Sequence, residues 1–128
     1  MKKSPVVHFE MPFKNSTRVT EFYSRVFGWD MQSMGESMSN YILAGTTETE
    51  NMKSTKAGEI NGGFFVSSEE NNKYPLITIQ VEDIIESMEA VKTAGGKVLS
   101  GPHEIPGVGL YSSIQDSEEN RVSLLQAQ

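Results

Sequence analysis

Two side chains that can carry out acid–base chemistry stand two positions apart near the start of the chain, His8 and Glu10. In residues 5–11 (PVVHFEM), the apolar Val7, Phe9 and Met11 alternate with Val6, His8 and Glu10. This two-residue period is that of a β-strand. Both side chains are therefore expected on one face. Glu10 is the candidate catalytic acid or base, with a hydrogen-bonded or salt-bridged glutamate as the structural alternative.

Other kinds of chemistry find less support. The chain has no cysteine, which excludes thiolate catalysis, disulfides and zinc–thiolate sites. It contains no G-x-S-x-G nucleophile motif, and the glycines of residues 107–109 precede a predicted strand rather than a helix that could hold a phosphate. His103, the second of two histidines, is expected to be solvated in a loop.

Composition predicts one globular domain over residues 1–128, with 37% hydrophobic residues and a formal net charge of −6. Phosphate-backbone binding needs a cluster of basic residues, so nucleic acid is not expected as a partner. No stretch is apolar for long enough to span a bilayer, and the absence of cysteine fits the cytoplasm. The acidic charge favours a cationic ligand or, more simply, serves solubility.

The apolar residues repeat a strand–helix–three-strand order twice. The first helix begins at a cap, Asn15 or Ser16, and ends at Gly28, and strands are expected at 29–34, 40–44 and 62–67, with a polar loop over 45–58. After a strand at 75–81, Asp83 caps a second helix that ends at residues 94–96. Three further strands follow at 97–100, 109–115 and 121–126.

This repeat predicts an α+β fold built from two βαβββ modules, about residues 5–67 and 75–126. Neither module has enough surface to bury its sheet alone, so their sheets are expected to form one curved mixed sheet around a cleft.

Several segments resemble the glyoxalase/bleomycin-resistance/extradiol-dioxygenase superfamily, also called vicinal oxygen chelate (VOC) proteins. They are VVHFEMP, TRVTEFYSRVFGW, PLITIQVEDIIESMEAVKTAGGKV and IPGVGLYSSIQDSEENRVSLLQ. The D-S-E-E-N of residues 116–120 is similar to the D-P-E-G-N turn of that family, with its Pro and Gly replaced. The resemblance runs nearly from end to end and leaves out only the loop at residues 45–58.

In that family a divalent metal is often held by four ligands, on the first and last strands of each module. The resemblance places the first ligand at His8, the third at Ile77 and the fourth at Gln126. For the second, strand parity leaves Glu59 and Asn61, and Glu59 is the better candidate. His8 suits zinc, nickel, manganese or iron, but isoleucine cannot bind a metal and an amide is a poor donor. A metal is therefore not expected; if one binds, its ligands are His8, Glu59 and Gln126.

Ile77 is the position in the second module that corresponds to His8 in the first. Alternation along the strands from these positions predicts the residues that line the central cleft: His8, Glu10, Ile77, Ile79, Leu124 and Gln126. The sequence thus favours a protein, homodimeric by resemblance, that binds a small, partly apolar molecule without a complete metal centre. Two alternatives remain open: a metal-dependent lyase, isomerase or dioxygenase, and an antibiotic-sequestering or regulatory binding module.

Overall fold

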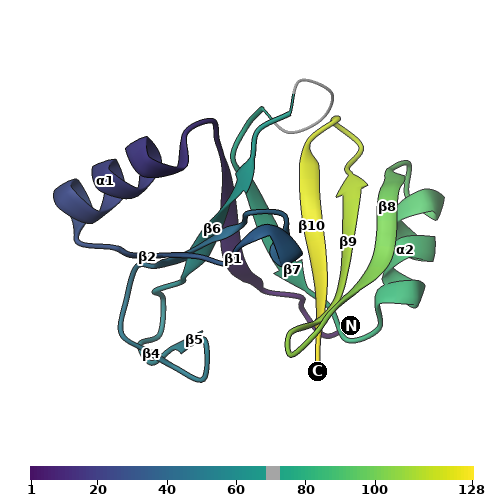
Figure 1. The fold of residues 1–128 in the computed structure, drawn as a ribbon. Coiled ribbons are helices and arrows are strands. Elements are labelled where there is room, and N and C mark those ends of the chain that lie inside the picture. The colour runs from purple at the N-terminus through teal and green to yellow at the C-terminus, as the bar shows by residue number, and fades with distance from the viewer. Residues whose placement is uncertain (69–72) are drawn as a thin grey trace. The chain divides into compact units, whose positions relative to one another are not determined.

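The computed structural model describes residues 1–68 and 73–128, which divide into two compact units, His8–Pro75 and Met1–Val7 with Leu76–Gln128. The chain runs through a strand, a helix and three main strands, and then through the same series again (Figure 1). The predicted α+β fold of two βαβββ modules is confirmed.

The unit His8–Pro75 holds a mixed sheet in the order β2-β3-β6-β1, together with helix α1 and a short β4–β5 hairpin. The bounds are β1 Val6–Phe13, α1 Ser16–Phe27, β2 Asp30–Ser33, a 3₁₀ turn at Glu36–Met38, β3 Ile42–Gly45, β4 Thr49–Glu50, β5 Lys53–Ser54 and β6 Gly62–Val66. β6 runs parallel to β1, and the other neighbouring strands run antiparallel.

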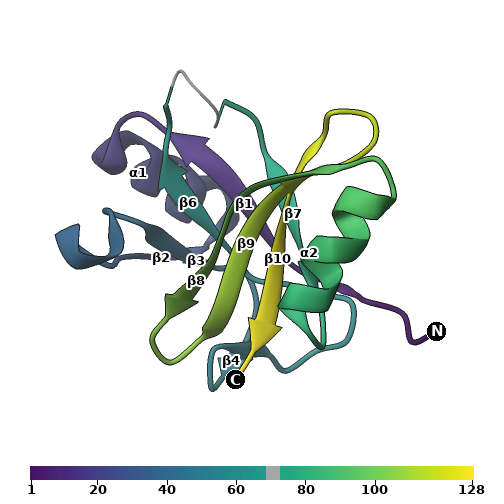
Figure 2. The same ribbon diagram turned by 90° about the vertical axis from the view of Figure 1, so that its right-hand side faces the viewer.

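The second unit holds a sheet in the order β7-β10-β9-β8, with α2 packed against it (Figure 2). Its bounds are β7 Leu76–Gln80, α2 Ile84–Thr93, β8 Lys97–Ile105, β9 Gly109–Gln115 and β10 Arg121–Ala127. β7 is parallel to β10, whereas β10, β9 and β8 are antiparallel neighbours.

Both helices begin and end where their sequences predict. The Asn15 side chain accepts a hydrogen bond from the backbone N–H of Arg18 at 2.9 Å, and Asp83 accepts one from Glu86 at 3.0 Å. α1 ends at Gly28, whose φ of 71° is a left-handed conformation that glycine adopts at low cost.

The two helices differ in how deeply they pack. Ile84 and Met88 of α2 are buried against Ile114, Val122 and Leu124 of the sheet. No residue of α1 is fully buried, and it covers the core residues Phe13, Ile42, Ala44 and Phe64 with partly buried Val19 and Tyr23. As a result α1 leaves Phe22, Val26 and Phe27 more than half exposed.

Two segments expected to be loops form strands instead. Residues 45–58 contain the β4–β5 hairpin, whose turn residues Asn51 and Met52 both have positive φ, as a two-residue hairpin turn requires. β8 continues through the Gly/Pro-rich stretch to Ile105, so His103 lies on a strand and pairs with Tyr111 of β9. The pairing of β8 with β9 is irregular after Val98, and this irregularity accommodates the glycine and the proline of the stretch.

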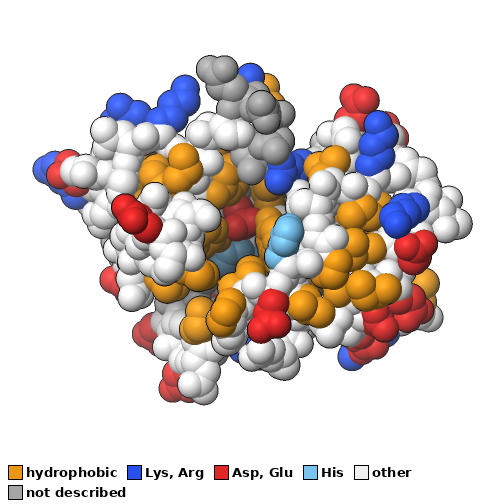
Figure 3. Space-filling model, turned by 45° about the vertical axis from the view of Figure 1, so that its right-hand side comes forward, with side chains coloured by type: hydrophobic (Ala, Val, Ile, Leu, Met, Phe, Trp, Pro, Cys, Tyr) orange, Lys and Arg blue, Asp and Glu red, His pale blue; other side chains and the backbone are white. Residues whose placement is uncertain are grey.

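No helix in the described part of the chain is both long and apolar enough to cross a membrane. Acidic, basic and hydrophobic side chains are interspersed over the face shown in Figure 3.

Candidate functional site

The sheet of unit His8–Pro75 has a covered face and an open face. Phe9, Met11 and Phe13 of β1 pack into the core beneath α1. Because successive side chains of a strand alternate, His8, Glu10 and Pro12 project from the opposite face, here called the open face because the helix of this unit does not cover it. In the parallel register of β1 with β6, Glu10 pairs with Gly63 and Pro12 with Phe65, so these two positions of β6 also belong to the open face.

His8 is held by a phenol on this face. Its Nε2 lies 3.1 Å from the hydroxyl oxygen of Tyr41, a residue just before β3. A Cβ at Gly63 would overlap the Tyr41 ring, so the missing side chain on β6 provides the space in which the phenol lies. The backbone fixes Tyr41 too, since its N–H donates to the carbonyl of Met38 and its carbonyl accepts from the N–H of Met34.

Burial and charge act on His8 in opposite directions. Burial lowers its pKa below the ordinary value of 6.5, because the charged imidazolium loses hydration, and the negative charge of nearby Glu10 opposes this in part. The net direction is downward, so His8 is neutral at neutral pH. A neutral imidazole can share a hydrogen bond with the Tyr41 hydroxyl in either direction, according to its tautomer.

The side chains present do not fit a four-ligand metal centre. Within residues 1–68 and 73–128, no group of three or more His, Asp or Glu side chains is placed to hold a metal ion. At the end of the first module, the open-face positions of β6 are Gly63 and Phe65, which offer no donor atom. The exposed Glu59 accepts a hydrogen bond from the Thr47 hydroxyl.

The predicted residues of the second unit lie on a different face from the one expected. Ile79 and Leu124 pack into the core beneath α2. The amide oxygen of Gln126 accepts a hydrogen bond from the backbone N–H of Ile84 at 2.8 Å, which satisfies a donor at the start of α2. By alternation Ile77, which is 43% exposed, shares this covered face with Ile79. Ligand binding by these four side chains stays a prediction, and their contacts are structural.

For Ile77 and Ile79 the cause is an error of one residue in matching β7 to β1. Phe9, Met11 and Phe13 of β1 face α1. Ile79 of β7 and Val81 just after it pack beneath α2, and Ile77 lies on the same side by alternation. His8 therefore corresponds to a position next to Ile77, since a shift of one residue exchanges the faces of a whole strand.

A row of hydroxyl groups, which the sequence interpretation missed, occupies the face of the second sheet that points away from α2. Thr78, Ser123 and Ser113 pair across β7, β10 and β9. Ser123 shares a hydrogen bond of 2.6 Å with the Tyr111 hydroxyl. The hydroxyls of Thr78 and Ser113 are buried without a hydrogen-bond partner among the described residues. Alternation separates these hydroxyl residues from the Ile77 and Ile79 set, but only the contact with α2 shows which of the two sets is covered.

Solved structures share this fold at low sequence identity. A hypothetical protein from Bacillus halodurans is 14% identical, with a TM-score of 0.68, over 99% of this chain and 96% of that one. The methylmalonyl-CoA epimerase of Mycobacterium tuberculosis is 11% identical, with a TM-score of 0.67, over 100% and 93% of the two chains. A variant of the Streptomyces coelicolor epimerase, in complex with 2-nitronate-propionyl-CoA, is 12% identical, with a TM-score of 0.70, over 98% and 99%.

A search of curated proteins found no match. The family model described as Glyoxalase/Bleomycin resistance protein/Dioxygenase superfamily matches residues 6–124, which is nearly the whole chain and includes both helices and every main strand, the last of them in part. The chain belongs to this superfamily.

Proposed function

We propose that the chain binds a small, partly apolar organic molecule on the open face of β1, β3 and β6, through hydrogen bonds rather than a metal ion. The observation that carries the proposal is the contact between the His8 imidazole and the Tyr41 hydroxyl, beside the Glu10 carboxylate. Three different polar groups thus gather where β6 contributes only Gly63 and Phe65.

The chemistry of these groups defines the ligand. A neutral imidazole and a phenol each donate and accept hydrogen bonds, whereas a carboxylate only accepts. Phe65 and Pro12 supply apolar surface next to them. This combination suits a molecule that has an N–H or O–H group to donate to Glu10 and an aromatic or aliphatic body.

Glu10 is also the group that suits proton transfer. Its side chain is only 7% exposed, and a carboxylate held away from bulk water can take a proton from a bound molecule and return it. We propose Glu10 as the catalytic residue if the bound molecule is transformed. Glu10→Gln keeps the shape of the side chain and removes the base, so it separates catalysis from binding.

Metal-dependent lyase, isomerase or dioxygenase chemistry is not part of the proposal, because the donor set among the described residues does not fit a complete centre. An antibiotic-sequestering module would differ from this proposal only in the ligand that it binds. Binding of cationic aromatic molecules would test that alternative directly. A homodimer in the cytoplasm remains part of the proposal, and light scattering at several protein concentrations measures the oligomeric state.

A fragment screen by saturation-transfer NMR, with phenols, amides and aromatic amines, tests the proposal. Hits are titrated against wild type and Tyr41→Phe, which removes one hydroxyl. Tyr74→Phe is the matched control, since Tyr74 is 77% exposed. We expect hits to bind Tyr41→Phe about tenfold more weakly and Tyr74→Phe unchanged. The absence of any hit, or equal binding to all three proteins, would overturn the proposal.

A further inference from the structure

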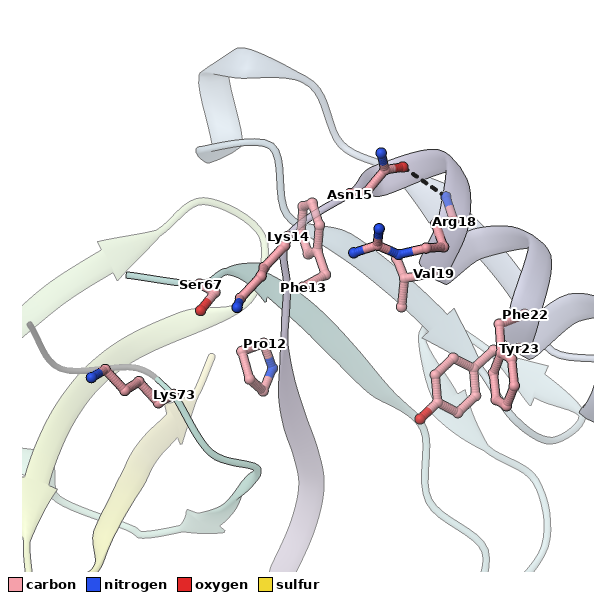
Figure 4. Close-up of a pocket in the computed structure, with 10 residues that line it drawn as sticks. All are labelled: Pro12, Phe13, Lys14, Asn15, Arg18, Val19, Phe22, Tyr23, Ser67 and Lys73. Atoms are coloured by element: carbon pink, nitrogen blue, oxygen red, sulfur yellow. Dashed lines mark hydrogen bonds between the residues drawn. The ribbon is translucent and has the colours of Figure 1, made fainter. Parts of the chain in front are cut away.

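A second candidate site lies in unit His8–Pro75, where β1 ends and α1 begins. An open groove of about 420 Å³ is formed there, within the size range of small-molecule sites (Figure 4). Its lining residues are Pro12, Phe13, Lys14, Asn15, Arg18, Val19, Phe22, Tyr23, Ser67 and Lys73.

The described charged residues of this groove are basic, whereas the chain as a whole is acidic. The chain has 17 acidic and 11 basic residues, yet among the described residues that line the groove are Lys14, Arg18 and Lys73 and no Asp or Glu. In the described part of the chain the ion pairs are Lys2–Glu82 and Lys92–Glu89, so none of the three cations is neutralised in this way. The described lining of the groove therefore carries positive charge on an acidic protein.

The charged and apolar groups occupy different parts of the groove. Lys14 and Lys73 lie at the Ser67 end, whereas Phe22 and Tyr23 lie at the opposite end, with Arg18 and Val19 between (Figure 4). The Phe22 ring meets those of Tyr23 and Phe27 edge-on, and 53% of the residue is still exposed, so it offers apolar surface to an occupant. An occupant that complements both ends has an anionic head and an apolar body.

We propose that this groove binds a soluble organic phosphate that carries an apolar group. A phosphate dianion matches several cations better than a singly charged carboxylate does, and the planar guanidinium of Arg18 can donate two parallel hydrogen bonds to it. The positive end of the α1 dipole lies at the same place and favours the same charge.

Calorimetric titration with n-hexyl phosphate tests the proposal, with inorganic phosphate and hexan-1-ol as partial ligands. We expect hexyl phosphate to bind more tightly than either, because only it satisfies both ends. Trp29 is the only tryptophan and stacks on the groove residue Tyr23 at 4.7 Å between ring centroids, so its fluorescence should change on binding.

Variants separate the groove from general electrostatics. Lys14→Gln with Arg18→Gln should weaken hexyl phosphate binding about tenfold. The control, Lys3→Gln with Lys97→Gln, removes the same charge at exposed positions outside the groove and should leave it unchanged. Phe22→Ser should weaken hexyl phosphate but not inorganic phosphate, whereas Val26→Ser on the same helix should have no effect.

Three outcomes would overturn this proposal. They are no binding of hexyl phosphate, equal losses of affinity in the two double variants, or, in an NMR titration of wild type, amide resonance shifts that map outside the groove. Binding only to vesicles that contain phosphatidic acid would instead assign the groove to a lipid surface and contradict a soluble ligand. Because the test uses no open-face residue, its failure leaves the fragment experiment unaffected.

Discussion

At His8, burial and a neighbouring carboxylate shift the pKa of the imidazole in opposite directions. Burial is the larger influence and holds the pKa of the imidazole below 6.5, while Glu10 acts to raise it. The ring is therefore neutral when it meets the Tyr41 hydroxyl, which makes it a hydrogen-bonding group rather than a fixed positive charge. A ligand on the open face would meet that neutral pair beside a carboxylate.

This lowered pKa has a consequence for stability. As the pH falls, the unfolded chain takes up a proton at its histidine before the folded chain does. The contribution of neutral His8 is thus complete above about pH 6.5 and is lost as the pH falls from there toward the folded-state pKa. Wild type should lose stability between about pH 7.5 and about pH 5.5, and His8→Gln should lose less.

Urea unfolding at the two pH values measures the effect, and His103→Gln serves as a comparison because it removes the other imidazole and keeps the His8–Tyr41 contact. Equal pH dependence in wild type and His8→Gln would contradict the assigned direction of the pKa.

Among the secondary-structure elements, α2 depends on a side chain that lies far away in the sequence. The amide oxygen of Gln126 on β10 accepts the N–H of Ile84, one of the unpaired donors in the first turn of α2. Gln126→Ala should reduce the free energy of unfolding by about 1 kcal/mol. Gln128→Ala at the chain end is the control.

The same variant also tests the ligand role predicted from the sequence. If Gln126 acts only at the start of α2, fragments that bind the open face of β1 should bind Gln126→Ala with unchanged affinity. A large loss of affinity in a stably folded variant would restore the ligand role.

The turn between β9 and β10 contains a residue in a conformation that suits glycine. Glu119 has a φ of 69°, at the position where the family's D-P-E-G-N pattern has Gly. Asp116 holds this turn through hydrogen bonds from Glu118 and Asn120, which lower its pKa. Glu119→Gly should stabilise the protein by roughly 0.5–1 kcal/mol, because relief of the left-handed strain exceeds the added chain entropy.

Thermal unfolding measures this difference, with Glu118→Gly as the control because Glu118 is not among the residues with positive φ. A lower melting temperature for Glu119→Gly would contradict the argument.

For the whole molecule, the repeated pattern of apolar residues was sufficient to predict the fold, and the helix ends at Asn15, Gly28 and Asp83 followed from local capping chemistry. The face of each strand was harder to predict. Alternation in β7 says that Ile77 and Thr78 point to opposite sides, but only contact with α2 decides which side is covered. An error of one residue on β7 therefore moved Ile77 and Ile79 to the other face, and Leu124 and Gln126 of β10 lie on that face too.

The His8–Tyr41 contact could not be predicted for a similar reason. It depends on a bend that brings residue 41 over β6 and on the absence of a side chain at Gly63, and neither is a local property of the sequence. Because Ile77 lies on the covered face, it has no bearing on a metal at the other face. What speaks against a metal centre is that the described residues bring no three His, Asp or Glu side chains together.

Metal content tests the central claim most directly. The protein would be expressed with zinc, nickel, manganese and iron in the medium, purified without chelators, and analysed by mass spectrometry beside His8→Ala. We predict far less than one metal ion per chain in wild type, with no difference in the variant. Near-stoichiometric metal that is lost in His8→Ala would contradict the account.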